Sequence, residues 1–187
     1  MTHTDSDNTN NAARNERVRR AFFGNRLFIA AFIGVALWFG GNALLHRNSL
    51  EGKPAPVFSG TMLDGGIFAL EEHLGKQPVL LDFWAVWCPP CREALPKVAA
   101  AAVAHADNGL VVCAVNLKET PDTVHAFLQG RGLELPVLLD SDGAVAAKYG
   151  VKAIPMLVFI NRAGNVNRVH VGAMSKEELD EALAAIL

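Results

Sequence analysis

The sequence has little cysteine, and its three residues of this type are too few for a scaffold held together by disulfides. Positive charge is also scarce in the larger part of the chain. From residue 50 onward, eleven Lys and Arg stand against sixteen Asp and Glu. A mildly acidic domain without a basic stripe argues against binding to nucleic acid. We therefore expect no nucleic-acid partner.

Patterns typical of metal sites are missing as well. The six histidines form no paired motif, whereas a structural zinc site needs four ligands at suitable spacing. No Met-rich or His-rich segment supplies a further soft ligand for copper. We predict no metal site. A copper-delivery chaperone that uses the paired cysteines described next remains as an alternative from another functional class.

The sequence does contain a Cys-x-x-Cys motif, formed by Cys88, Pro89, Pro90 and Cys91. It follows an apolar run that predicts a buried strand, Val79–Trp84, and precedes a helical stretch from residue 92 to about residue 105. If Cys88 is the N-cap, the prolines fill the first turn, where a missing N–H costs little.

In this geometry the N–H of Cys91 points back at the sulfur of Cys88, and the helix dipole favours a thiolate there. Both effects lower the pKa of Cys88 below about 8.5, and Cys91, one turn further on, stays a thiol. A purely structural disulfide is disfavoured because so short a loop constrains the unfolded chain little. The pattern predicts reversible disulfide chemistry with no other cofactor.

The third cysteine, Cys113, lies inside the apolar run 110–115. The first interpretation is a small core residue, because buried apolar cysteines are inert. The alternative is a third redox-active thiol.

The amino-terminal part of the chain predicts a membrane anchor. A polar and arginine-rich tail, residues 1–26, precedes an uncharged run at 27–45, which is long enough to cross the hydrocarbon core. The arginines place the tail in the cytoplasm, so a linker at 46–56 leads to an exported domain at 57–187. The alternative is a cleaved signal peptide, with a small-x-small site at 41–43.

The remaining pattern alternates between strands and helices, which predicts an α/β sheet with helices on both faces. A turn at 64–66 predicts a hairpin, Thr120 followed by proline predicts a helix start, and Ser175 with Glu178 forms a capping box. The predicted strands are 57–63, 67–70, 79–84, 110–116, 136–139, 155–160 and 166–171, and the predicted helices begin near 71, 92, 121, 144 and 176.

These residues resemble a known family. The stretch 82–91 is similar to the active-site segment of thioredoxins, and 150–155 followed by an apolar strand is similar to their cis-proline loop. The stretch 52–66 resembles the extra N-terminal hairpin of the membrane-anchored TlpA-like branch, which includes the thioredoxins of cytochrome c maturation. The resemblance implies a thioredoxin-like fold, a central mixed sheet flanked by helices, with an N-terminal hairpin extension.

The resemblance also implies catalytic roles. Cys88 would be the attacking thiol and Cys91 the resolving thiol. Asp82 matches the buried acid that helps to move the proton of Cys91, although many TlpA-like chains carry asparagine there. An aspartate in so apolar a run is costly unless it is used or paired. The alternative is an acid at the end of a strand that water reaches.

The substrate-binding residues follow from the same resemblance. Ile154 and Pro155 would form a cis peptide bond, with the backbone of Ile154 pairing with an incoming substrate strand. Trp87, Pro89 and Pro90 would surround the reactive sulfur. The alternative for Pro155 is a trans proline at the start of a strand.

One position departs from the TlpA-like pattern. Those chains often place a glutamate three residues after the second cysteine, where this chain has Ala94. Glu93 lies one residue earlier, about 100° around the helix, and we expect it to be a solvated surface acid.

Together these features predict a monomeric, exported thiol-disulfide oxidoreductase that reduces protein disulfides and takes part in cell redox homeostasis and cytochrome c maturation. A single helix would tether it to the inner membrane with its domain in the periplasm, and a membrane thiol donor would regenerate it. An oxidant or isomerase with the same cysteines is the alternative. A peroxidase is disfavoured because no Thr-x-x-Cys pattern precedes Cys88.

Overall fold

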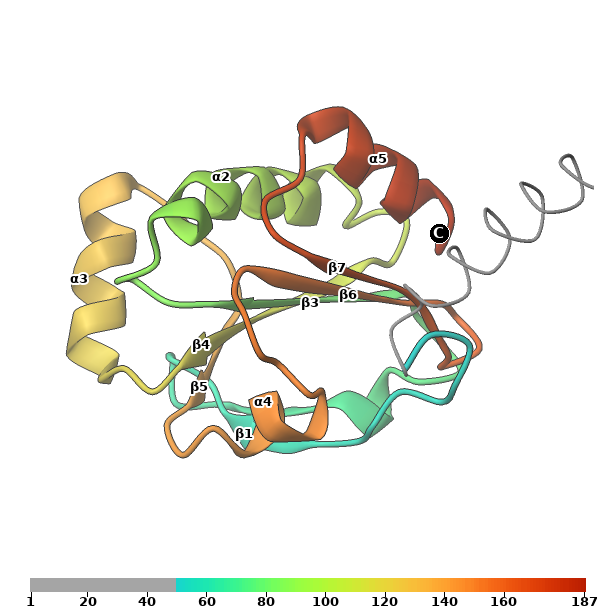
Figure 1. Ribbon diagram of the computed structural model, residues 1–187, viewed down its shortest axis with the longest axis horizontal. Coiled ribbons are helices and arrows are strands. Elements are labelled where there is room, and N and C mark those ends of the chain that lie inside the picture. Colours follow the sequence, from blue (N-terminus) through green and yellow to red (C-terminus); the bar gives the residue numbers. More distant parts are fainter. Residues whose placement is uncertain (1–49) are drawn as a thin grey trace, which may run out of the picture. The chain divides into compact units, whose positions relative to one another are not determined.

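The computed structural model describes residues 50–187 (Figure 1). The predictions of a cytoplasmic tail and of an anchor at 27–45 lie outside these residues. Between residues 50 and 187, no helix is both long and apolar enough to span a bilayer.

The domain is built around a five-stranded mixed sheet. In space the strands follow the order β5-β4-β3-β6-β7. The first three are parallel to one another, and β6 runs antiparallel to both β3 and β7. The strands are β3 (Val79–Trp84), β4 (Val111–Leu117), β5 (Val137–Asp140), β6 (Met156–Ile160) and β7 (Val166–Val171). This is the predicted thioredoxin-like mixed sheet.

Helices cover both faces of the sheet (Figure 1). Alternation along β3 divides the core, because Leu80 packs with residues of α2 and α5, whereas Leu81 and Phe83 face α4 and the N-terminal hairpin. The helical segments are η1 (Leu70–Glu72), α2 (Pro89–Ala104), α3 (Pro121–Arg131), α4 (Ala144–Lys148) and α5 (Lys176–Ala184).

The predicted N-terminal hairpin is present, and its two strands are shorter than the predicted ones at 57–63 and 67–70. Its strands are β1 (Ser59–Thr61) and β2 (Ile67–Ala69), paired antiparallel. The hairpin attaches to the sheet at β5, where the N–H of Leu63 donates to the carbonyl of Val137. Its aromatic residue Phe68 is buried in the core.

The folded domain begins before Val57, the boundary predicted from the sequence. Gly52 donates to the carbonyl of Val166, and Val166 donates to that of Lys53. Ala55 is buried and donates to the carbonyl of Gly164. The second half of the predicted linker therefore belongs to the domain, because its backbone pairs with the β6–β7 hairpin.

The predicted helix starts are confirmed by their caps. The side chain of Thr120 accepts from the N–H of Thr123, and Ser175 and Glu178 form a reciprocal capping box. Helix α3 ends at Arg131, where Gly132 adopts a left-handed conformation with φ of 60°.

The topology gathers three loops at one end of the sheet. The parallel strands β3 and β4 end together, since Trp84 is registered with Asn116. The antiparallel strand β6 begins at the same end, since Phe83 is registered with Met156. Residues 85–88, the loop after Leu117 and the loop before Met156 therefore meet there.

Candidate active site

Cys88 is the N-cap of α2, as the motif predicted. Its backbone is extended, with φ of −90° and ψ of 108°, and the two prolines occupy the first two helical positions. The N–H of Cys91 donates to the Cys88 sulfur across 3.3 Å. A thiolate at this position is stabilised by that N–H and by the helix dipole.

Cys88 and Cys91 form a disulfide whose Cα atoms are 5.3 Å apart. Both residues are buried, with exposed fractions of 3% and 1%. Exposure therefore does not separate their roles. The N-cap geometry does, because only the sulfur of Cys88 accepts the helix N–H.

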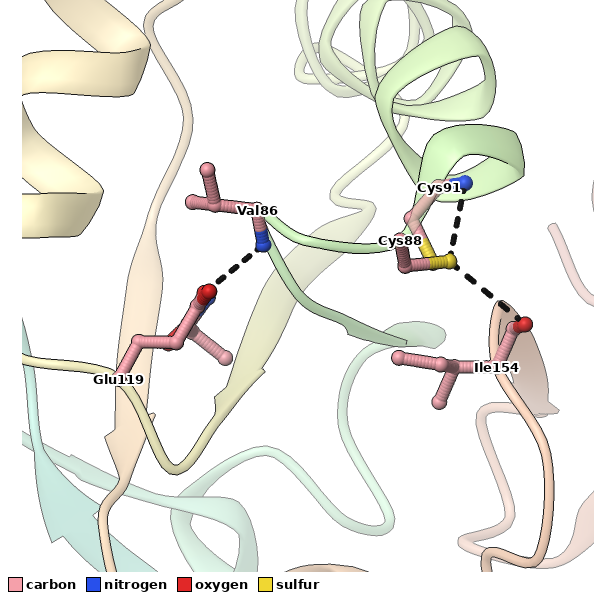
Figure 2. Close-up of a disulfide and its surroundings, with 6 residues drawn as sticks. Val86, Cys88, Cys91, Glu119 and Ile154 are labelled. Carbon is pink, nitrogen blue, oxygen red and sulfur yellow. Dashed lines mark hydrogen bonds between the residues drawn. A yellow bond between two sulfur atoms is a disulfide. The ribbon is translucent and has the colours of Figure 1, made fainter.

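The loop before β6 lies against the disulfide. The peptide bond between Ile154 and Pro155 is cis, and the Ile154 carbonyl oxygen is 3.7 Å from the Cys88 sulfur (Figure 2). The antiparallel register of β3 and β6 explains this contact, because it brings the start of β6 to the end of β3. The structure thus brings together two segments that lie 66 residues apart in the chain.

The surroundings of the disulfide are exposed and partly apolar. Trp87 is 68% exposed, and both prolines of the motif are exposed. A cavity of about 380 Å³ adjoins Trp87, between the end of β4 and α4. Its other lining residues are Leu117, Lys118, Gly143, Ala146, Ala147 and Val151.

Asp82 is buried in the middle of β3, with an exposed fraction of 1%. Its Oδ1 accepts no hydrogen bond from any residue between 50 and 187. Strand alternation places it on the same face as Leu80 and Trp84, the face that α2 covers. Burial raises the pKa of Asp82 to about 7. The alternative of an acid at the strand end reached by water is wrong.

Cys113 belongs to the core on the opposite face of the sheet. It is fully buried among residues such as Val115 and Leu138, and it forms no disulfide. Burial raises the pKa of its thiol to about 12. A thiol that is neutral and shielded from solvent is inert, so the interpretation as a core residue fits the structure.

The first turns of α2 show the expected departure from the TlpA-like pattern. Ala94 is buried and cannot supply a carboxylate, and Glu93 is exposed. Across residues 50–187, no three His, Cys, Asp or Glu side chains group together as a metal site would require.

Sequence reasoning missed Glu119, which lies next to the motif (Figure 2). Its Oε2 accepts hydrogen bonds from the Val86 N–H at 2.8 Å and from Asn116 Nδ2 at 2.7 Å. The available signal was its place two residues after β4, since loops that follow adjacent parallel strands meet at one edge of a sheet.

Comparison with known proteins agrees with this geometry. The model of the AhpC/TSA family matches residues 52–169. The thiol-disulfide oxidoreductase ResA of Halalkalibacterium halodurans is 33% identical over 171 residues, which cover 90% of this chain and 97% of that protein.

Two solved structures have the same fold and a sequence identity of about a third with this chain. DsbF of MTB, determined in mixed oxidised and reduced forms, is 34% identical, with a TM-score of 0.64 over 70% of this chain and 95% of its own. A secreted disulfide oxidoreductase of Mycobacterium tuberculosis, homologous to E. coli DsbE, is 30% identical. Its TM-score is 0.60, and the match covers 68% of this chain and 95% of that one.

Proposed function

The chain belongs to the AhpC/TSA family and is a thiol-disulfide oxidoreductase with a thioredoxin-like fold, and on this premise we propose that it reduces disulfides of exported proteins. One observation carries the proposal: the Cys88 sulfur is an N-cap acceptor at an exposed apolar face, 3.7 Å from a backbone carbonyl. That arrangement suits a polypeptide that brings a disulfide to Cys88.

The first step is the attack of the Cys88 thiolate on one sulfur of the substrate disulfide. The substrate S–S bond breaks, a mixed disulfide forms, and the other substrate sulfur leaves as a thiolate that takes a proton from solvent. The N–H of Cys91, at 3.3 Å from the Cys88 sulfur, stabilises the attacking thiolate. We assign this first role to Cys88 for that reason.

In the second step, Cys91 loses its proton and attacks the Cys88 sulfur. The mixed disulfide breaks, the second substrate thiol is released, and the Cys88–Cys91 disulfide forms. Two electrons pass from the protein dithiol to the substrate. Asp82 is our candidate for the proton acceptor, because burial raises its pKa to about 7, close to the value that an efficient base needs near neutral pH.

The surface around the disulfide supports a protein substrate. Trp87, Pro89 and Pro90 are exposed, and the cavity beside Trp87 has room for a substrate side chain. The cis bond leaves the backbone of Ile154 beside the reactive sulfur. We propose that these groups, with Pro155, hold an extended segment of the substrate.

The proposed place in the cell comes from the sequence. Residues 1–26 would be cytoplasmic, 27–45 would anchor the protein in the inner membrane, and the domain would face the periplasm as a monomer. A membrane thiol donor would return two electrons to the disulfide after each cycle. Apocytochrome c is a candidate substrate. The secreted mycobacterial relative supports the export of such a domain.

The rival functions differ in measurable ways. An oxidant or isomerase would use the same cysteines in the opposite direction, and a copper chaperone would bind the metal through them. A peroxidase needs the Thr-x-x-Cys pattern, which this chain lacks although it belongs to the AhpC/TSA family.

The deciding experiment is the reduction potential of the Cys88–Cys91 pair, followed by trapping of partners. A reductase should lie near the thioredoxin value of about −270 mV, whereas a value near about −120 mV indicates an oxidant. A Cys91→Ala variant should accumulate mixed disulfides with exported proteins through Cys88, and Cys88→Ala is the matched control. Stoichiometric copper in protein purified under reducing conditions would instead favour the chaperone.

A further inference from the structure

Glu119 connects the end of β4 to the turn that carries the reactive cysteine. One carboxylate oxygen, Oε2, accepts from both the Val86 N–H and Asn116 Nδ2. In Figure 2, Glu119 reaches Val86 on one side of the turn, and Ile154 approaches Cys88 on the other. The turn is therefore bonded by Glu119, and the cysteine at its end is contacted by Ile154, a residue distant in sequence.

The backbone before Glu119 is strained. Lys118 has a φ of 56° and, within residues 50–187, no other non-glycine residue has a positive φ. A left-handed conformation is unfavourable for an L-residue with a side chain. Such strain persists where surrounding contacts impose it, and it concentrates at functional sites. The contacts here include the bond from the Lys118 N–H to the Asp140 carbonyl.

Asn116 is fully buried, and its side-chain amide is hydrogen-bonded to Glu119. Its Nδ2 donates to the carboxylate, while its Oδ1 has no hydrogen-bond partner anywhere between residues 50 and 187. If the side-chain amide were rotated by half a turn, Asn116 Oδ1 would face Glu119 Oε2, and two acceptor oxygens would repel each other. A buried asparagine with one unpaired oxygen is costly. The one hydrogen bond of its side chain within residues 50–187 fixes the carboxylate that binds Val86.

Glu119 is not needed to start the helix that follows it. Thr120 is the N-cap of α3, and its side chain accepts the N–H of Thr123. The carboxylate of Glu119 instead points back toward the motif. Its contacts therefore serve the turn of residues 85–87 and not α3.

That turn determines whether Cys88 can act as an N-cap. Between Trp84 and Cys88, the turn is held by the bond from Cys88 N–H to the Ala85 carbonyl and by the bond from Val86 to Glu119. Hydrogen bonds to charged acceptors are stronger than those between neutral groups. Loss of the second bond would free the turn to move, and with it the backbone that sets the Cys88 sulfur above the Cys91 N–H.

We propose that Glu119 is a positioning residue for thiol-disulfide exchange: as a hydrogen-bond acceptor it holds residues 85–87 and so keeps Cys88 in the N-cap geometry that stabilises its thiolate. The proposal rests on the attacking role assigned to Cys88 above. It concerns the acceptor function of Glu119 and not its charge, which by itself disfavours a nearby thiolate.

The test compares variants of equal charge. Glu119→Gln and Glu119→Ala are both neutral, but only glutamine retains an acceptor oxygen of the same reach. Glu119→Asp retains the charge but is one methylene shorter, so it is compared with the wild type. The measurements on the reduced full-length protein are the pH dependence and the rate of Cys88 alkylation by iodoacetamide, with thermal unfolding recorded in parallel.

We expect the apparent pKa of Cys88 to be about one unit higher in Glu119→Ala than in Glu119→Gln. Below both pKa values, alkylation should then be about threefold to fourfold slower, because a tenfold smaller thiolate fraction is partly offset by a more nucleophilic sulfur. In Glu119→Asp, the apparent pKa of Cys88 should likewise be higher than in the wild type, because the shorter side chain no longer reaches the turn. A merely structural role would lower the unfolding temperature without moving the pKa of the folded protein.

The control is the exposed acid Glu93, in the second turn of α2. Its Gln and Ala variants should give the same Cys88 pKa, since Glu93 bonds no backbone group of the turn. Equal pKa values and rates in folded Glu119→Ala and Glu119→Gln would overturn the proposal. Failure of the assigned roles themselves would look different, because Cys91 would then be alkylated first in the wild type.

Discussion

Asp82 lies opposite Ala114 in the register of β3 and β4. The neighbouring strand therefore offers the carboxyl no polar or cationic side chain at the paired position. On the other side, β6 pairs Asp82 with Leu157. Desolvation without a compensating charge is the cause of the raised pKa of Asp82, about 7.

The first prediction concerns the proton taken from Cys91. Replacing Asp82 with asparagine keeps the shape and removes the base, so the mixed disulfide should resolve about tenfold or more slowly. Alkylation of Cys88 should change much less, because the N-cap N–H is intact. Stopped-flow measurement of both steps decides this, and unchanged resolution between about pH 6 and 8 would make Asp82 a purely structural residue.

The second prediction concerns stability against pH. The pKa of Asp82 is about 7 in the folded protein and about 3.9 when unfolded. Between these values the folded state holds the extra proton, so the free energy of unfolding falls as the pH rises from about 4 to 7 and then levels off. Asp82→Asn should abolish this fall in the free energy of unfolding. At about 1.36 kcal/mol per pKa unit, the fall amounts to a few kcal/mol.

Urea unfolding at pH 5 and pH 8 should therefore show the stabilising effect of Asp82→Asn growing with pH. Glu93→Gln, at an exposed position, is the control and should show no such growth. If the unfolding free energies of Asp82→Asn and the wild type differed by the same amount at both pH values, position 82 would not hold a buried carboxyl that titrates.

The third prediction separates the three cysteines. Iodoacetamide should label Cys88 first in the reduced protein, with an apparent pKa below about 8.5. Cys113 should stay unlabelled until the protein unfolds, because it is fully buried and burial raises the pKa of its thiol to about 12. Mass spectrometry of peptides labelled at increasing times checks the order, and earlier labelling of Cys91 or Cys113 would reverse the assigned roles.

The fourth prediction concerns recognition of protein substrates. Trp87→Ala should raise KM for a protein disulfide about fivefold, the effect of losing about 1 kcal/mol of contact with an exposed aromatic side chain. Exchange with a small dithiol should stay within about twofold, since the cysteines are untouched. Val103→Ala is the control, because Val103 is a comparably exposed apolar residue, 77% against 68%, near the other end of α2. Equal effects of both variants would exclude Trp87 from substrate binding.

The fifth prediction concerns topology. A reporter active only outside the cytoplasm, fused after Leu187, should be active, because arginines at positions 14 to 26 precede the apolar run at 27–45. A fusion that lacks residues 1–45 should be inactive in the same assay. Activity of a cytoplasmic reporter on the full chain would contradict both the proposed location and the proposed partners.

The sequence by itself determined the elements whose causes are local. Two prolines between Cys88 and Cys91 specify a first helical turn, and both the N-cap and the strand Val79–Trp84 are where the pattern predicts them. The capping box at Ser175 and the turn before Ile67 follow from neighbouring residues in the same way. The resemblance to thioredoxins added the cis bond before Pro155, which spacing alone does not indicate.

Only the tertiary structure decided the features that depend on pairing between distant strands. The register of β3 with β4 and β6 left Asp82 without a polar neighbour and put Ile154 beside Cys88. The same register brought Glu119 to Val86, 33 residues away in the chain. Residues 52–55 were predicted to be part of a linker, but they belong to the domain because their backbone forms hydrogen bonds with the β6–β7 hairpin. Strand register is set by how all the apolar faces pack at once, and no local pattern contains that information.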